Sequence, residues 1–150
     1  MIQINSTDSI LKSSCETYVN PVNCVGVMGA GLALLFKKEF PGYFKDYSNK
    51  CKIGSIKIGK VDIYKTEKFF PSYILSFPTK NHWKDRSNLE DIEKGLLSLK
   101  EVIILHNIKS IAIPCIECGL GGLNKEDVKL LIYRHLDFID RLVILYDYKK

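Results

Sequence analysis

Residues 19–34 read Val-Asn-Pro-Val-Asn-Cys-Val-Gly-Val-Met-Gly-Ala-Gly-Leu-Ala-Leu, and they carry the densest motif of the chain. The residues before it, Thr-Tyr-Val at 17–19, predict a strand that runs into Asn20. A glycine-rich loop follows, and the sequence from Gly31 to Glu39 predicts a helix that Pro41 ends. Glycines let backbone amides approach phosphate oxygens, and a helix N-terminus adds partial positive charge. The stretch is therefore a candidate phosphate-binding loop, and a tight structural turn is the alternative.

The glycine spacing of this loop excludes two common nucleotide motifs. Gly26, Gly29 and Gly31 follow the pattern G-x-x-G-x-G, whereas the dinucleotide fingerprint is G-x-G-x-x-G. The lysine of a P-loop is also missing after the last glycine. The asparagines at 20 and 23 offer both donors and acceptors, which suits ribose hydroxyls. The loop therefore predicts a phosphate and sugar ligand without naming a standard cofactor.

Strands and helices alternate on either side of this stretch, which predicts an α/β sheet covered on both faces, with ligands at the carboxyl ends of the strands. Ser87, with Glu90 three residues later, forms a predicted capping box at the start of a helix. Asn124 is the predicted cap of the last helix, whose apolar residues share one face. The remaining predicted strands are residues 2–4, 56–64, 73–77, 108–113 and 142–146, and the remaining helices are residues 43–50, 87–107 and those after Asn124.

The composition is that of one ordinary globular domain. The chain has 150 residues, of which 46% are hydrophobic and 26% charged, so it can bury a core without disulfides or metals. We find no apolar run of the roughly 18 residues that a membrane span needs, and no basic-then-apolar signal peptide. We therefore expect a cytoplasmic protein that does not enter a membrane. The net charge of +5 is compatible with an anionic ligand or a nucleic acid and diagnostic of neither.

Five cysteines are scattered along the chain. An odd number without a secretory signal argues against a disulfide framework, so we expect reduced thiols. Cys115 and Cys118 have the C-x-x-C spacing of half a zinc site, but a second pair of ligands is missing. We therefore predict no metal site.

Two further segments place polar residues or glycines after predicted strands. Residues 76–83 read SFPTKNHW and contain Lys80, His82 and the only tryptophan of the chain, Trp83. Residues 118–123 read CGLGGL and lie between a predicted strand and a predicted helix. Two glycine-rich loops after two strands predict a cleft that grips a diphosphate from both sides. Residues 76–83 have two interpretations: Lys80 and His82 lie over the reactive end of the ligand with Trp83 shaping the pocket, or an exposed lysine lies beside a tryptophan that packs on the core.

Together these segments resemble the macrodomain family, over nearly the whole chain. The first two motifs are similar to those of the DNA ADP-ribosyl glycohydrolase antitoxins of the DarT–DarG type, a branch that also resembles the terminal ADP-ribose protein glycohydrolases. The resemblance implies one macrodomain over residues 1–150, with a central mixed, mostly parallel sheet and helices on both faces. It also implies an ADP-ribosyl hydrolase that binds ADP-ribose and needs no cofactor. The residues that carry it are 19–37, 77–83, 88–96 and 119–123.

The resemblance assigns roles to residues of this chain. Lys80, in the Phe-Pro-Thr-Lys motif, would be the catalytic residue, with Asn23 beside it at the distal ribose. A neutral lysine amine can attack an anomeric carbon, and a protonated one can stabilise charge on a leaving group; the sequence leaves both open. The expected ADP-ribose contacts are Asp8, Ser9, Ile10, Asn20, Asn23, Gly26, Val27, Met28, Gly29, Ala30, Gly31, Thr79, His82, Cys118, Gly119, Leu120, Gly121, Gly122 and Leu123.

Two departures from the family pattern matter. Macrodomains usually read adenine with an aspartate after the first strand, and counting back from Asn20 puts Ser9 at that place and Asp8 one residue earlier. A shift by one residue would allow Asp8 to serve, or adenine is read differently. The glutamate-type terminal glycohydrolases place an aspartate in the second glycine loop, where this chain has Gly121. That difference favours nucleic acid over protein glutamate as the substrate.

The leading functional hypothesis is a hydrolase that removes ADP-ribose from modified DNA, at thymidine, and so reverses a toxin-like transferase. One alternative is a hydrolase of ADP-ribosylated protein, O-acetyl-ADP-ribose or ADP-ribose 1″-phosphate. Another is a reader that binds ADP-ribose without turnover, although a reader has no need for Lys80. We expect a monomer, and no direct toxin binding because the chain length is accounted for by the macrodomain.

Overall fold

The strands of the protein form one sheet, and the carboxyl ends of its parallel strands share one edge. The structure is a computed structural model that describes residues 1–118 and 122–147. Within these residues the sheet has six strands in the order β1-β6-β5-β2-β4-β3. Every neighbouring pair is parallel except β3 with β4, which confirms the mixed, mostly parallel sheet. The strands are β1 (Ile2–Asn5), β2 (Thr17–Asn23), β3 (Asp62–Lys65), β4 (Tyr73–Lys80), β5 (Ser110–Pro114) and β6 (Leu142–Tyr146).

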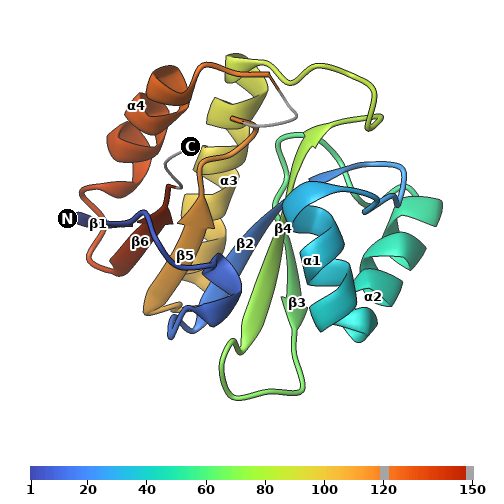
Figure 1. Ribbon diagram of the computed structural model, residues 1–150, viewed down its shortest axis with the longest axis horizontal. Helices are drawn as coiled ribbons and strands as arrows, with labels where there is room; N and C mark the ends of the chain where they lie inside the picture. The colour runs from blue at the N-terminus through green and yellow to red at the C-terminus, as the bar shows by residue number, and fades with distance from the viewer. Residues whose placement is uncertain (119–121, 148–150) are drawn as a thin grey trace.

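Helices cover both faces of this sheet, as predicted (Figure 1). Successive strand residues point to opposite faces, so Val19 of β2 joins one apolar cluster while Tyr18 and Val22 join the other. The first cluster contains the apolar faces of α3 and α4, and the second contains those of α1 and α2. The helices are α1 (Gly31–Glu39), α2 (Pro41–Lys52), α3 (Leu89–Leu105) and α4 (Lys125–Leu136), with a short 3-10 helix, η1 (Ile10–Lys12), before β2.

Two prolines lie inside the central strands, at the end where neighbouring strands stop. Pro21 of β2 pairs with Phe77 of β4, whereas β5 pairs only with the first two residues of β2. Pro78 of β4 lies beyond Ser76, the last residue of β4 that pairs with β3. A proline removes one backbone donor from a sheet, and here each stands where one side of the ladder has already ended. The two strands thus extend past their neighbours and build the rim of the sheet.

One glycine allows α3 to lie directly on β4. A Cβ atom built on Gly95 would approach the Phe77 ring to 2.3 Å, far inside contact distance. The Phe77 ring is fully buried and has little room to move. Gly95 therefore sets the distance between α3 and the strand that carries Lys80.

We expect Gly95→Ala to destabilise the protein by about 1–3 kcal/mol, because overpacking a buried contact outweighs the gain of about 0.5–1 kcal/mol from replacing a helical glycine. Urea unfolding measures this change. Gly54→Ala is not a suitable matched control, because Gly54 has a positive φ. The double variant Gly95→Ala/Phe77→Leu serves instead. The smaller side chain should recover part of the lost free energy. A Gly95→Ala protein as stable as the wild type would contradict the proposed tight contact.

The predicted elements agree with the structure except at three places. The helix at residues 31–39 and the strand at residues 142–146 are confirmed. The predicted strand over residues 56–64 is wrong in its first half, because Gly59 takes a positive φ of 83° and the strand begins only at Asp62. The predicted N-cap Ser87 is also wrong: Asn88 caps α3 by accepting a hydrogen bond from the Asp91 amide.

The third difference lies at the ends of the two central strands: β2 runs past Asn20 to Asn23, and β4 continues to Lys80, three residues past its predicted end. The extension of β4 follows from its pairing with β2, which the local sequence does not reveal.

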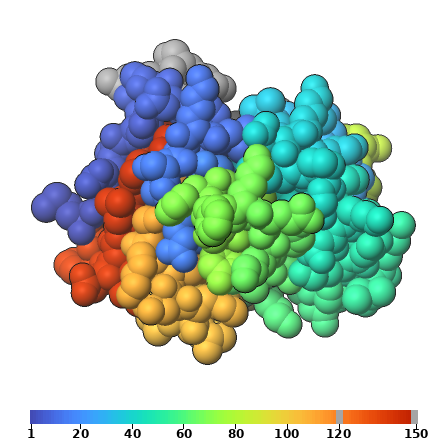
Figure 2. Space-filling view, turned by 90° about the horizontal axis from the view of Figure 1, so that it is seen from below, coloured from blue at the N-terminus to red at the C-terminus, as the bar shows by residue number. Residues whose placement is uncertain are grey.

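The β3–β4 connection lies at the opposite edge of the sheet, where the parallel strands begin. Its atoms form the green group at the centre of Figure 2. No helix in residues 1–118 and 122–147 combines the length and the apolar composition that crossing a bilayer requires.

Candidate active site

A cavity of about 520 Å³ opens at the carboxyl ends of β2, β4 and β5. This is the edge at which ligands bind in parallel α/β sheets. Its walls are the end of β2, the loop before α1, the first turn of α1, the end of β4 and the start of the segment after β5. The residues that line it are Pro21, Val22, Asn23, Val27, Gly29, Ala30, Gly31, Leu32, Ala33, Lys80, Trp83, Pro114, Cys115 and Glu117.

Asn23 and Lys80 are neighbours at the base of the cavity. Their Cα atoms are partners in the β2–β4 ladder, after a register shift between Val22 and Asn23. The Cys24 amide then donates to the Asn81 carbonyl over 3.0 Å and keeps the two chains together beyond the strands. The two predicted catalytic residues, 57 positions apart in sequence, are thus brought to one place by strand pairing.

The Asn23 side chain organises the first glycine loop. Its Nδ2 donates to the Val27 carbonyl over 2.8 Å, and its Oδ1 accepts from the Val25 and Val27 amides. Tyr47 donates to the same Oδ1 over 2.8 Å, and burial raises the pKa of the Tyr47 phenol, which keeps it a donor. An asparagine has two amide hydrogens, so one donor of Asn23 remains for a ligand.

The first turn of α1 forms one wall of the cavity. Its N-cap is Ala30, in an extended conformation, and no side chain in the described part of the chain caps the helix. The first amides of a helix have no intrahelical acceptor and carry partial positive charge. Gly29 and Gly31, beside Ala30, line the cavity and have no side chains that could cover these amides. Figure 1 shows α1 starting beside the end of β2, so the amides face the ligand edge of the sheet. This wall can bind phosphate oxygens.

Lys80 contacts a buried carboxylate across the cavity. Its Nζ lies 3.2 Å from Glu117 Oε2, and the two side chains are only 11% and 10% exposed. Thr79 donates to Glu117 Oε1 over 2.9 Å, and Ser87 donates to Oε2 over 3.1 Å. Thr79, predicted as a ligand contact, is buried beneath the cavity and supports Glu117 instead of lining the wall.

Trp83 lines the cavity and is 51% exposed, and the His82 ring lies against its ring at 5.4 Å between centroids. The Lys84 Nζ lies 5.1 Å from the Trp83 ring centroid. His82 itself is exposed, accepts a hydrogen bond from the Lys84 amide through Nδ1 and does not contribute to the cavity wall. Trp83 therefore offers an accessible aromatic surface beside Lys80.

Several predicted ligand residues lie outside the cavity wall. Asn20 is fully buried and donates to the Tyr43 hydroxyl over 3.1 Å, and Met28 packs in the same apolar cluster beneath the loop. Asp8 is exposed and accepts from Asn5 over 3.0 Å. The remaining residues of this set are Ser9, which caps η1, Ile10, which is buried in the core, and Gly26, which turns the loop with a φ of 84°. Their contacts with ADP-ribose stay predictions.

The second glycine loop is described only at its ends. Cys118 is half-buried, Gly122 has a φ of 74°, and the Leu123 amide donates to the Glu117 carbonyl over 3.1 Å. The predicted contacts Gly119, Leu120 and Gly121 lie outside the described residues. The hydrogen bond at Leu123 closes the loop back onto Glu117 and so fixes both its ends near the cavity.

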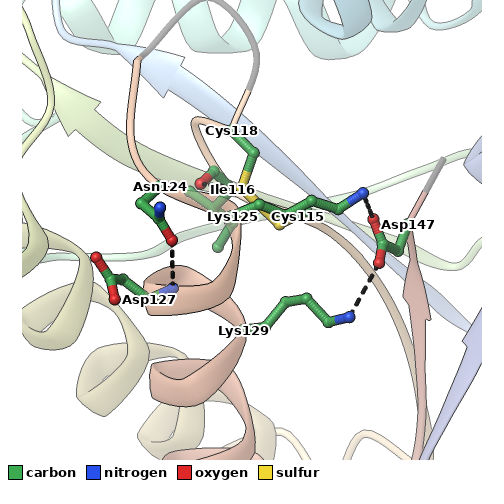
Figure 3. Close-up of a disulfide and its surroundings, with 8 residues drawn as sticks. All are labelled: Cys115, Ile116, Cys118, Asn124, Lys125, Asp127, Lys129 and Asp147. Carbon is green, nitrogen blue, oxygen red and sulfur yellow. Dashed lines mark hydrogen bonds and ion pairs between the residues drawn. A yellow bond between two sulfur atoms is a disulfide. The ribbon is translucent and has the colours of Figure 1, made fainter. Parts of the chain in front are cut away.

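The expectation of five reduced thiols is wrong for one pair, because Cys115 and Cys118 are joined by a disulfide (Figure 3). Their Cα atoms are 5.9 Å apart across the turn that holds Glu117, a separation that a disulfide can bridge. Figure 3 also shows Lys125 and Lys129 of α4 reaching Asp147 after β6. Within residues 1–118 and 122–147, no group of three or more histidine, cysteine or acidic side chains could hold a metal ion.

Glu117 and Ser87 are site residues to which the sequence analysis gave no role or another one. The signal for Glu117 was present: it is a single charge inside the otherwise apolar run Pro-Cys-Ile-Glu-Cys. Ser87 was interpreted as a helix cap, and it donates to Glu117 instead. Glu117 contacts Lys80 and Ser87, which are 37 and 30 positions away in the chain, so only the folded chain reveals these contacts.

Comparison with known proteins agrees with this geometry. The Macro domain family matches residues 19–132. A Mycobacterium tuberculosis protein named DNA ADP-ribosyl glycohydrolase is 45% identical over 130 residues, which cover 86% of this chain and 37% of that protein. The chain thus spans little more than a third of the curated relative.

Two solved structures are similar over almost the whole chain. The macrodomain of Mycobacterium tuberculosis DarG superposes with a TM-score of 0.95 at 39% identity, covering 100% of this chain and 99% of that one. The structure of Thermosipho africanus DarTG in complex with ADP-ribose gives a TM-score of 0.91 at 34% identity, covering 97% of this chain and 41% of that one.

Proposed function

The chain belongs to the macrodomain family, and from that premise we propose that it binds ADP-ribose in this cavity and hydrolyses it from a modified macromolecule. The observation that carries the proposal is the meeting of two features in one cavity. The uncapped N-terminus of α1 offers amides to a diphosphate, and Lys80, at the end of β4, lines the same cavity as the ladder partner of Asn23. Binding and bond cleavage would thus take place in one space.

In this proposal the diphosphate lies over Gly29 and Ala30, and the distal ribose lies between Asn23 and Lys80. Hydrolysis breaks the glycosidic bond between the anomeric carbon and the acceptor, and water supplies a hydroxyl group to the sugar and a proton to the acceptor. The remaining Asn23 donor would contact a ribose hydroxyl. Lys80 would stabilise the charge that develops at the reacting end.

We further propose that the acceptor is a base in single-stranded DNA, at thymidine. The name of the Mycobacterium tuberculosis relative supports DNA as the acceptor, and Trp83 supports an unpaired base, because an exposed ring at the cavity can stack on one. On this proposal the chain is an antitoxin-like cytoplasmic monomer that reverses a DNA-modifying transferase. The alternative substrates are ADP-ribosylated protein, O-acetyl-ADP-ribose and ADP-ribose 1″-phosphate.

A substrate panel tests the acceptor. The wild-type protein is incubated in parallel with an oligonucleotide carrying ADP-ribosyl-thymidine, a glutamate-modified protein, O-acetyl-ADP-ribose and ADP-ribose 1″-phosphate, and initial rates are compared. We expect the oligonucleotide to react at least tenfold faster than the others. Trp83→Ala should lower the rate with the oligonucleotide and leave the rates with the two small substrates within threefold. A faster rate with the modified protein would assign the cavity to that substrate class.

The role of Lys80 can be separated from its charge. In the resting cavity Lys80 donates to Glu117, an arrangement that supports the electrostatic role over direct attack. We therefore expect Lys80→Arg, which keeps the charge and removes the amine, to retain more activity than Lys80→Met. Borohydride treatment of the wild type during turnover, followed by mass spectrometry, should give no adduct at Lys80. A trapped sugar on Lys80, with an inactive Lys80→Arg protein, would establish covalent catalysis instead.

A further inference from the structure

Glu117 is the one charged side chain of the segment after β5 that reaches the cavity, and its backbone is unusual. Its φ of 60° lies in the left-handed region, which costs a residue with a side chain about 1–2 kcal/mol relative to the usual conformations. Glycine adopts this conformation without that cost. A glutamate at this position therefore costs conformational free energy in the turn, and contacts of its side chain must offset that cost.

The compensation is visible in the contacts of the carboxylate. Glu117 accepts hydrogen bonds from Thr79, Lys80 and Ser87, at distances between 2.9 and 3.2 Å. The first two donors come from the end of β4, and the third precedes α3, so the carboxylate joins three parts of the fold. Both Thr79 and Ser87 are themselves buried. A carboxylate with three donors in a buried position is held in one place and orientation.

The direction of these contacts assigns the neutral donors a supporting role. The Thr79 hydroxyl also lies 3.3 Å from the Val22 carbonyl, so its one proton is shared between that oxygen and Glu117, and Ser87 directly precedes the N-cap of α3. They fix the carboxylate, and the carboxylate then contacts Lys80. A lysine side chain has a flexible stem of four carbons. Holding its ammonium against a fixed anion removes most of its rotational freedom.

From this geometry we infer that Glu117 is a positioning residue for Lys80: it holds the Lys80 ammonium at the cavity wall in the orientation in which it meets the reacting end of the ligand. The inference rests on the proposed function, and it goes beyond it by assigning a role to the strained turn between Cys115 and Cys118. Glu117 acts through Lys80 and forms no bond with the substrate in this account.

The positive φ of Glu117 allows a test that separates the loss of the carboxylate from a loss of stability. Glu117→Gly removes the carboxylate that contacts Lys80. It also removes the cost of the positive φ, because glycine adopts this conformation without strain. Glu117→Gln keeps the size of the side chain and an acceptor for Thr79 or Ser87, and removes only the charge. Glu90→Gln, an exposed acid on α3 in a surface ion pair, is the matched control for loss of one negative charge.

Steady-state kinetics of ADP-ribose release are measured for these variants, together with thermal unfolding. We expect kcat to fall on the order of 100-fold in Glu117→Gly and Glu117→Gln, because a small displacement of a catalytic group costs about that much. KM should stay within threefold, and the Tm of Glu117→Gly should not fall below that of Glu117→Gln. If kcat of both variants stays within threefold of the wild type, Glu117 does not position Lys80.

A second measurement needs no substrate and so separates this inference from the proposed function. The ammonium resonance of Lys80, assigned by its absence in Lys80→Arg, is followed in ¹⁵N-lysine-labelled protein by NMR. An ammonium held by Glu117 should give a resolved resonance in the wild type and in Glu90→Gln, and lose it in Glu117→Gln. An unchanged resonance in Glu117→Gln overturns the inference. A wild type that shows the expected NMR result but releases no ADP-ribose would overturn the proposed function alone.

Discussion

Lys80→Met is expected to reduce the rate of ADP-ribose release on the order of 10³-fold while ADP-ribose still binds within about fivefold of the wild-type affinity. The first effect follows because a preorganised charge at the reacting centre contributes about this much to catalysis. The second follows because the diphosphate is expected at the first turn of α1, whereas Lys80 lies at the end of β4. Single-turnover kinetics measure the first effect, and isothermal titration calorimetry measures the second.

The same substitution leaves Glu117 without its partner, and removing one member of a buried ion pair costs about 3–5 kcal/mol of stability. The double variant Lys80→Met/Glu117→Gln removes both charges and should fold more stably than Lys80→Met alone. It should be equally inactive. Lys94→Met, which removes an exposed lysine of α3, controls for the loss of one positive charge. Activity of the double variant within tenfold of the wild type would exclude Lys80 from the reaction.

Ala30→Asp is expected to weaken ADP-ribose binding about 100-fold or more and to stabilise the free protein. Ala30 is the N-cap of α1 and is already extended, the conformation in which an aspartate accepts from the first amides of the helix. The new cap should add about 0.5–2 kcal/mol to the free energy of unfolding. The same carboxylate occupies the amides proposed for the diphosphate and repels its charge, which accounts for the loss of affinity.

Ala30→Ser separates these two effects, because serine caps a helix without adding charge. It should raise stability by a similar amount and weaken binding much less than Ala30→Asp. The opposite signs of the two effects also exclude misfolding as the cause of lost binding. Equal affinities of wild type and Ala30→Asp for ADP-ribose would mean that the diphosphate does not use the N-terminus of α1.

The sequence predicted those parts of the site that depend on residues close together in the chain. The helix at Gly31 follows from the glycines before it and from Pro41 after it, and these signals are local. Lys80 was identified through its motif, and its place beside Asn23 follows from two strands that end at the same edge. The alternation of strands and helices was therefore enough to predict that both glycine loops and Lys80 follow the carboxyl ends of strands, at one edge of a parallel sheet.

The parts that escaped prediction depend on contacts between distant residues. Asn20 has the same chemistry as Asn23, yet strand alternation and the Tyr43 hydroxyl place it in the core rather than at the cavity. Ser87 and Asn88 are both good caps, and the choice between them depends on Glu117, which takes the Ser87 hydroxyl. Glu117 itself has a positive φ, which residues other than glycine rarely adopt. Predictions from local sequence preferences fail at such positions, where the contacts of a functional site outweigh them.

We propose that this cavity both binds ADP-ribose and releases it from DNA. A substoichiometric amount of wild-type protein is added to a single-stranded oligonucleotide carrying ADP-ribosyl-thymidine, and both products are followed by mass spectrometry. We predict many turnovers, with free ADP-ribose and the unmodified oligonucleotide formed in equal amounts. An oligonucleotide that keeps its modification, in the presence of protein that binds free ADP-ribose by calorimetry, would contradict the claim and identify a reader of ADP-ribose.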